Sequence, residues 1–220
     1  MTTALSEFIK LVAPDVITCP SAIVERETVG AIIEFCEKSD IFTKEFNVEL
    51  DSDDIDSDTQ NSIDIVVGGY LGDTYRPVSM IACMVDSTPY TPEYREIMNT
   101  VTYWDSIKDP NVKYFHFVDN YRLRLYDMST SDDYVYIKLT VKPLRTATVF
   151  DDVLYEDYAE VIAAGAKYRI LSNANKLWAN PSMLNENYRK WRRGLSRAKL
   201  RRNKNFTHVS QHVNWQSFED

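Results

Sequence analysis

Residues 155–171, YEDYAEVIAAGAKYRIL, decide the fold class of this chain, because they combine helical spacing with a run of very small side chains. Apolar residues recur there at steps of three and four, which predicts an amphipathic helix. Asp151 or Asp152 can cap its first turn, and we expect it to run to about Ser172. The run Ala163-Ala164-Gly165-Ala166 leaves room for a second helix to approach closely. The expected apolar face consists of Tyr155, Tyr158, Ala159, Ile162, Ala163, Ala166 and Ile170.

The partner for this helix is predicted to follow it directly. Asn180-Pro181 combines a capping residue with a proline at the first helical position, which is a strong start signal. Apolar residues then recur at alternating steps of four and three, a seam that buries itself against a facing helix. The seam consists of Leu184, Tyr188, Trp191, Leu195 and Ala198.

Two further helices are expected near the N-terminus. Residues 3–13 carry one apolar stripe, formed by Leu5, Phe8, Ile9 and Val12, and Pro14 ends the helix. Residues 20–38 begin at Pro20 and have a wide apolar face, as in helices that pack on more than one neighbour.

The middle third of the chain has a different character. Asp119-Asn120 fits a tight hairpin turn, Gly68-Gly69 and Gly72 mark another reversal, and residues 51–58 form an acidic loop. Short runs rich in β-branched and aromatic residues predict strands at Ile63–Val67, Val78–Val85, Lys113–Val118, Tyr121–Tyr126 and Tyr134–Val141.

Together these patterns predict an α+β fold, a bundle of about four helices with an inserted, small antiparallel β region and an extended C-terminal arm. The length of 220 residues fits one elaborated domain. Within it we expect N-terminal helices at 1–40, a β-rich insertion at 41–150, a C-terminal helix pair at 151–203 and a docking arm at 204–220.

The charge of the chain is unevenly distributed. Residues 189–204 contain nine basic residues and no acid. Of 25 basic residues this leaves 16 elsewhere, against 33 acidic ones, a balance of −17. We rank a contact with a neighbouring subunit or partner first, DNA second and a solvated face third. The candidate subunit-interface or DNA-channel residues are Arg189, Trp191, Arg192, Arg193, Arg197, Lys199, Arg201 and Arg202.

The last residues carry a second candidate site. Residues 203–220 lack a helical period, yet five large apolar residues are spaced along this polar stretch. Such a segment is expected to dock onto a partner, for example by adding a strand to an exposed sheet edge. The docking candidates are Phe206, Val209, Val213, Trp215 and Phe218.

The chain gives few signs of catalysis, so we expect no catalytic, cofactor-binding or metal-binding residues. It has six glycines and no phosphate-binding or nucleophile-elbow motif. The acidic loop lacks the Gly and Glu of a calcium loop, and His208 and His212 have no third ligand nearby. Cys19, Cys36 and Cys83 are expected to be buried free thiols. No stretch fits a membrane span or signal peptide, which predicts folding in the cytoplasm of the cell that makes the protein and no membrane partner.

Both ends of the chain resemble the head–tail adaptor proteins of tailed bacteriophages. The matching residues are Leu5…Phe8…Leu11-Val12-Ala13-Pro14-Asp15-Val16…Cys19-Pro20 and Tyr158-Ala159-Glu160-Val161-Ile162-Ala163-Ala164-Gly165-Ala166…Lys176-Leu177-Trp178-Ala179-Asn180-Pro181, followed by Tyr188 and the Arg-rich helix. Between them, Trp104, Pro110 and Leu123-Arg124-Leu125 fall where such proteins carry their β insertion. The acidic segment 50–60 and the weak strand before it depart from the pattern.

The resemblance implies a virion structural protein without catalysis, made in the host bacterial cytoplasm. It implies a dodecameric ring that joins the portal to tail or neck proteins and encloses passing genomic DNA. The alternative hypothesis is a DNA-binding regulatory protein that uses the basic helix 189–204. A residual hypothesis is a hydrolase in which Cys83 or the aspartates act.

Overall fold

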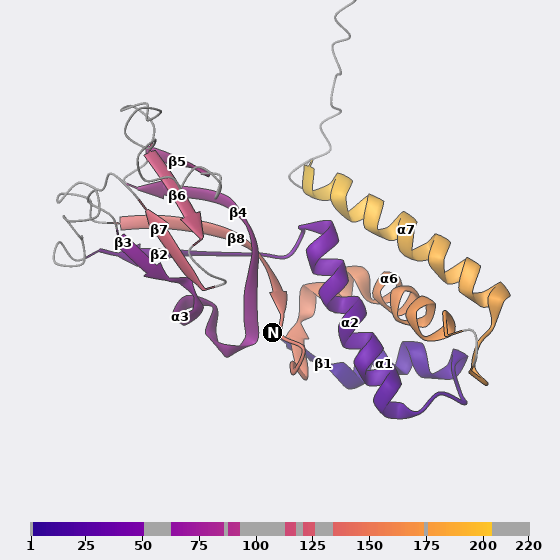
Figure 1. The fold of residues 1–220 in the computed structure, drawn as a ribbon. Coiled ribbons are helices and arrows are strands. Elements are labelled where there is room, and N and C mark those ends of the chain that lie inside the picture. The colour runs from indigo at the N-terminus through magenta and orange to yellow at the C-terminus, as the bar shows by residue number, and fades with distance from the viewer. Residues whose placement is uncertain are drawn as a thin grey trace, which may run out of the picture. The chain divides into compact units, whose positions relative to one another are not determined.

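The structure, a computed structural model, describes residues 2–50, 63–85, 88–92, 113–117, 121–125, 134–173 and 176–203 (Figure 1). The chain divides into two compact units, one formed by Met1–Ile41 with Asp151–Asp220 and the other by Phe42–Phe150. The second unit is therefore inserted in sequence between the two parts of the first. The expected acidic loop 51–58, the turn at Asp119-Asn120 and the arm 204–220 lie outside the described residues.

The first unit is helical and is built around one central helix. It contains β1 (Thr2–Ala4), α1 (Leu5–Val12), the 3-10 turn η1 (Ala13–Asp15), α2 (Ser21–Ser39), α6 (Asp152–Leu171) and α7 (Pro181–Asn203). Helix α6 contacts α1, α2 and α7. It carries the predicted small-residue run, in which Ala163, Ala164 and Ala166 are buried.

Local chemistry explains where these helices begin and end. Asp151 caps α6, because its side chain accepts a hydrogen bond from the Val153 backbone N–H, as the sequence predicted. Helix α1 ends at Val12, and the chain continues as the tighter turn η1 across Pro14. Helix α2 ends at Ser39, and the next residue, Asp40, has a left-handed backbone (φ 52°) and donates its N–H to the Cys36 carbonyl.

Aromatic side chains from three helices meet in the core of this unit. The ring of Phe35 on α2 lies 4.9 Å from that of Tyr158 on α6 and 6.0 Å from that of Trp191 on α7. Phe8 on α1 meets Tyr155 on α6 edge to face, with ring centroids 5.2 Å apart. Segments from the two ends of the chain thus share one apolar core.

The inserted unit contains a seven-stranded sheet in the order β2-β8-β4-β5-β6-β7-β3. Its strands are β2 (Thr43–Glu49), β3 (Ile63–Val66), β4 (Tyr75–Val85), β5 (Thr88–Pro92), β6 (Lys113–Phe117), β7 (Arg122–Leu125) and β8 (Tyr134–Pro143). Strand β8 pairs with both β2 and β4, and its Val135, Ile137 and Leu139 are completely buried on one face. The further strand β9 (Val149–Asp151) leads into α6.

The structure corrects the sequence prediction in this unit. Strand β5 was not predicted, and it pairs parallel to β6, so the sheet is not purely antiparallel as expected. The expected reversal at Gly68-Gly69 is instead a short helix, α3 (Val67–Leu71), followed by the 3-10 turn η4 (Gly72–Thr74). The change of direction follows at Gly72, whose φ of 62° suits a residue without a Cβ.

Candidate interaction surface on the last helix

Helix α7 begins with the cap that the sequence predicted. The side-chain oxygen of Asn180 accepts hydrogen bonds from the Met183 backbone N–H at 3.3 Å and from the Ser182 hydroxyl at 2.9 Å. Pro181 occupies the first helical position, where its missing N–H costs nothing. The start of the basic helix is therefore fixed by local chemistry.

One side of α7 is locked against α6 by two interlocking glycine contacts. Trp191 of α7 packs over Gly165 of α6, and Val161 of α6 packs over Gly194 of α7. A Cβ built on Gly165 would lie 2.6 Å from Trp191 Cε3, so the tryptophan fits only because that atom is missing. The short side chains of α6 thus set the close approach of the two helices.

Trp191 is consequently a core residue. Only 3% of it is exposed, and Leu195 and Ala198 are buried beside it. Three of the five residues of the predicted seam are thus buried, and Leu184 is half-buried. The placing of Trp191 on a subunit interface or DNA channel is corrected, because its side chain is buried within the helical unit. Asn187 and Gly194 are also buried, and Tyr188 is partly exposed and packs against Tyr168 with ring centroids 5.0 Å apart.

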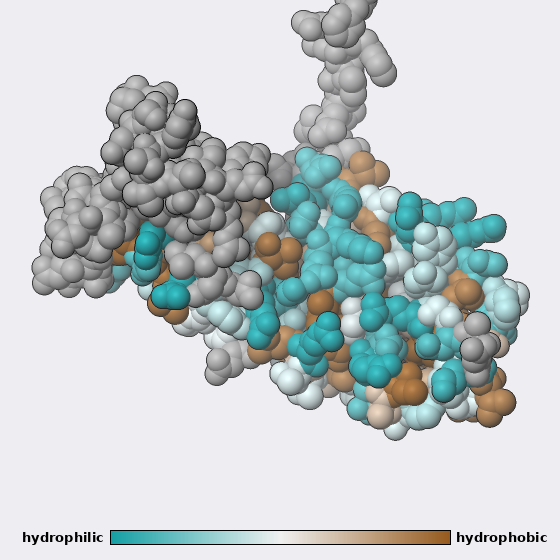
Figure 2. All heavy atoms as spheres, in the orientation of Figure 1, coloured by the Kyte–Doolittle hydropathy of each residue, from teal (hydrophilic) through white to brown (hydrophobic). Residues whose placement is uncertain are grey.

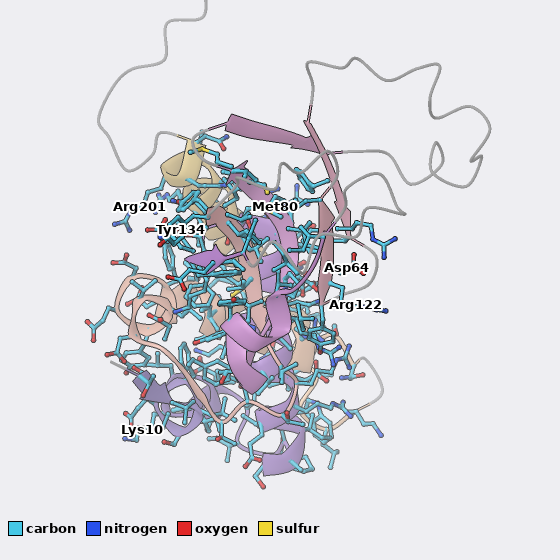
Figure 3. The ribbon with its side chains drawn as sticks, turned by 90° about the vertical axis from the view of Figure 1, so that its left-hand side faces the viewer. Lys10, Asp64, Met80, Arg122, Tyr134 and Arg201 are labelled. Carbon is cyan, nitrogen blue, oxygen red and sulfur yellow. The ribbon has the colours of Figure 1, made fainter. Side chains whose placement is uncertain are left out.

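Three of the basic residues of α7 have acidic partners. Lys190 pairs with Glu186 one turn earlier at 2.7 Å. Arg201, near the C-terminal end of the helix (Figure 3), pairs with Asp157 at 2.9 Å and donates to the Tyr158 hydroxyl at 3.2 Å. Arg202 lies 3.8 Å from Asp40. These three cations tie α7 to itself, to α6 and to the end of α2.

The remaining cations of α7 have no carboxylate partner in the part of the chain that the structure describes. Arg192 donates to the Tyr188 hydroxyl at 3.4 Å, with its guanidinium 5.8 Å from that ring, and contacts no acid there. All of these side chains are exposed. Hydrophilic residues make up much of the visible surface of the helix (Figure 2), and the apolar side chain of Leu200 is exposed beside them. We call Arg189, Arg192, Arg193, Arg197 and Lys199 the cationic face of α7.

The structure also bears on the cysteines named in the residual enzyme hypothesis. Burial raises the pKa of Cys83 to about 12, and it raises the pKa of Cys36 as well. At neutral pH both are thiols, which are much weaker nucleophiles than thiolates. All three cysteines are free and buried, as the sequence predicted.

The remaining predictions from the sequence concern the docking residues and two histidines of the C-terminal segment, a metal site and a membrane span. The docking residues Phe206, Val209, Val213, Trp215 and Phe218 lie outside the described residues, as do His208 and His212. Within the described part of the chain, no group of three or more histidine, cysteine or acidic side chains could hold a metal ion. None of the helices described is long and apolar enough to cross a membrane.

The sequence did not lead us to expect the ion pairs that Lys190, Arg201 and Arg202 make within the basic run 189–204. The pair of Lys190 with Glu186 has the four-residue spacing of a helical pair, which the sequence does show. The partners of Arg201 and Arg202 are 44 and 162 positions away, at Asp157 and Asp40, and no local pattern identifies them.

Comparisons with known proteins do not identify the chain. No protein-family model matches it, and no curated protein matches it.

Proposed function

We propose that this chain is a structural, non-enzymatic head–tail adaptor of a tailed bacteriophage. In this role copies form a ring in the virion neck, seated on the portal, with tail or neck proteins beyond it and the genomic DNA passing through. The C-terminal residues 204–220 dock on the portal or a tail protein. The cationic face of α7 contacts neighbouring protein or the passing DNA.

The main support is the way in which the two ends of the chain come together. The segments that carry the resemblance to head–tail adaptors are α1 with η1 at one end and α6 with α7 at the other. Contacts of α6 with α1, α2 and α7 join them in one helical unit, with the β-containing unit inserted between them in sequence. An adaptor of this type needs such a helical body with an insertion.

The second support is the exposed surface of α7, which the other helices of this unit do not cover. Five cations of α7 are exposed and lack a carboxylate partner among the described residues. Cations held in this way on a rigid helix suit an anionic macromolecule better than a small substrate. A binding and assembly role follows more naturally from this arrangement than a reaction does.

A portal-binding experiment tests the proposal. Deletion of residues 204–220 should leave a folded protein, because α7 ends at Asn203. The truncated chain should no longer co-sediment with purified portal rings of the same phage. Each large aromatic residue of the segment can contribute about 1.5–3 kcal/mol when buried against a partner.

Two matched variants separate the apolar anchors from the length of the segment. The triple change Phe206→Ser, Trp215→Ser and Phe218→Ser should abolish co-sedimentation, whereas Gln211→Ala, Asn214→Ala and Gln216→Ala should leave it intact. Undiminished binding by both the truncated chain and the serine variant would remove the docking segment from the proposal.

The cationic face also supports the alternative function, a DNA-binding regulatory protein. That protein would bind duplex DNA tightly, with an affinity that falls steeply as salt rises. The net charge of −8 opposes it, because the field of the whole chain repels DNA. A gel-shift assay without binding at low salt would dismiss this alternative.

A further inference from the structure

The apolar residues of α7 are mostly used up inside the helical unit. Trp191, Leu195 and Ala198 are buried there, whereas Leu200 and Tyr188 remain exposed, by 57% and 39%. The centre of a protein–protein interface is normally apolar and depleted of charged residues. An interface with DNA is more polar and much more positively charged. The composition of the cationic face therefore fits DNA better than a second protein.

The cations of this face form an extended row. Arg189, Arg193 and Arg197 are spaced by four residues, so about 6 Å of helix separates each from the next. Arg192 and Lys199 flank them, and the five cations extend along about 15 Å of helix. Like charges at this spacing repel one another, and no carboxylate within the described ranges pairs with them. DNA relieves this repulsion along the whole row, because each strand carries a phosphate every 3.4 Å or so of its axis.

The packing of α7 holds the row outward. Trp191 packs over Gly165 of α6, and Val161 of α6 packs over Gly194 on the buried side of α7. Rotation of α7 about its axis would break both contacts. The cations are therefore presented in a fixed orientation, which reduces the entropy cost of binding.

The net charge of −8 weakens binding of DNA by a free chain but acts over a limited range. At physiological ionic strength charges are screened beyond about 8 Å, so the groups nearest to the phosphates count most. The acids that contact α7 are already paired. Glu186 pairs with Lys190, and Asp157 pairs with Arg201 near the end of the helix.

We infer that the cationic face of α7 binds the phosphate backbone of duplex DNA, independently of base sequence. The inference rests on the proposed adaptor function, for which it names the partner of this face. Phosphate contacts hold a duplex in place without reading its sequence. A protein that binds in this way can also slide along DNA. In a virion neck, such a contact holds the genome and still lets it pass.

A titration with two duplexes tests the contact. The duplexes are labelled, equal in length and unrelated in sequence, and fluorescence anisotropy measures their binding to the full chain. Both should bind equally well, and the affinity should fall as salt rises from about 50 to 200 mM. Three to five phosphate contacts predict a slope of about −3 to −4.5 for log K against log salt.

Charge-neutral variants assign the binding to this face. R189Q/R193Q/R197Q should bind at least about tenfold more weakly at low salt, with a slope that is shallower by about 3. The control variant K10Q/R145Q/K176Q also removes three positive charges, at exposed positions outside α7, and should bind like the wild type. Circular dichroism checks that both variants are folded.

A duplex with an uncharged backbone separates phosphates from bases. Methylphosphonate linkages remove the charge of the backbone and leave the edges of the bases in place. Such a duplex, with one of the two sequences above, should not bind the full chain. Binding of this duplex as tight as that of the ordinary one would contradict a contact with phosphates.

Three further outcomes would overturn the inference. They are the absence of duplex binding at low salt, an unchanged slope in R189Q/R193Q/R197Q, and a strong preference for one sequence, which would favour a regulatory protein. An unchanged slope together with loss of self-association or portal binding would assign the face to protein. Co-sedimentation with portal rings is measured separately, so a chain that binds portal rings but no duplex would keep the adaptor function and lose only the DNA contact.

Discussion

Two glycines decide how closely α6 and α7 approach. In an exposed helix, Gly→Ala stabilises by about 1 kcal/mol. At Gly165 the added methyl group would lie 2.6 Å from Trp191 Cε3, and at Gly194 it would collide with Val161. We therefore expect Gly165→Ala and Gly194→Ala each to lower the free energy of unfolding by about 1–3 kcal/mol, as overpacked cores do. Urea denaturation followed by circular dichroism measures this.

Gly30 on α2 provides the matched control. A Cβ there would lie 2.9 Å from Arg169 Nη2, which is the far end of a flexible side chain. The guanidinium can shift by a few tenths of an ångström, so Gly30→Ala should cost much less than the other two changes. Equal stability of Gly165→Ala and the wild type would refute the close packing of α6 and α7.

Between helices, Arg169 of α6 makes the clearest polar contact, because it pairs with two glutamates of α2. We call this pair of contacts the clasp. Its Nε donates to Glu27 Oε2 and its Nη1 donates to Glu34 Oε2, both at 2.9 Å. Burial alone would raise the pKa of Glu34, but the hydrogen bonds and charges of Lys38 and Arg169 outweigh it and hold the pKa below its usual value. The clasp therefore stabilises the ionised form of Glu34.

The pH dependence of the clasp follows from this direction. Because the folded-state pKa of Glu34 is lowered, its contribution to stability is complete above the unfolded value of 4.5 and is lost as pH falls through the folded value. Arg169→Met should lower the free energy of unfolding by about 1 kcal/mol at pH 7, since the arginine is partly exposed to screening solvent. Urea unfolding at pH 7 and pH 3 checks this. If the wild type exceeds Arg169→Met in free energy of unfolding by as much at pH 3 as at pH 7, the proposed role of these ion pairs is contradicted.

Local chemistry explains which elements could be predicted from the sequence. Helices α6 and α7 have strong caps at Asp151 and Asn180, so their starts were predictable, and the alternating apolar residues of β8 marked a strand. Strand β5 has the sequence TPYTP, and its two prolines are unfavourable for strands. Its parallel pairing with β6 depends on the sheet as a whole and not on any local signal.

Local sequence patterns also predicted part of the candidate site. The basic run 189–204 was visible in the sequence, and the helical spacing of three and four gave its buried seam. Trp191 belongs to both patterns, and its burial depends on contacts with other helices, with Gly165 of α6 and Phe35 of α2. The partners of Arg201 and Arg202 are set by tertiary packing, so sequence alone did not separate them from the cations that remain open.

The whole molecule combines a helical unit, drawn from both ends of the chain, with an inserted unit that contains a seven-stranded sheet. In the proposed account the cationic face of α7 contacts neighbouring protein or the passing DNA, and residues 204–220 provide the attachment to the portal or tail. Each function is assigned to a different segment. Changes to the C-terminal segment should therefore weaken portal binding while the helical unit stays folded.

The mass of the complex formed by the full chain with purified portal rings of the same phage tests the central claim most directly. Native mass spectrometry or sedimentation velocity measures it. The adaptor account predicts one closed ring of copies on each portal ring. A chain that stays monomeric in the presence of portal rings, with no change in their mass, would contradict it.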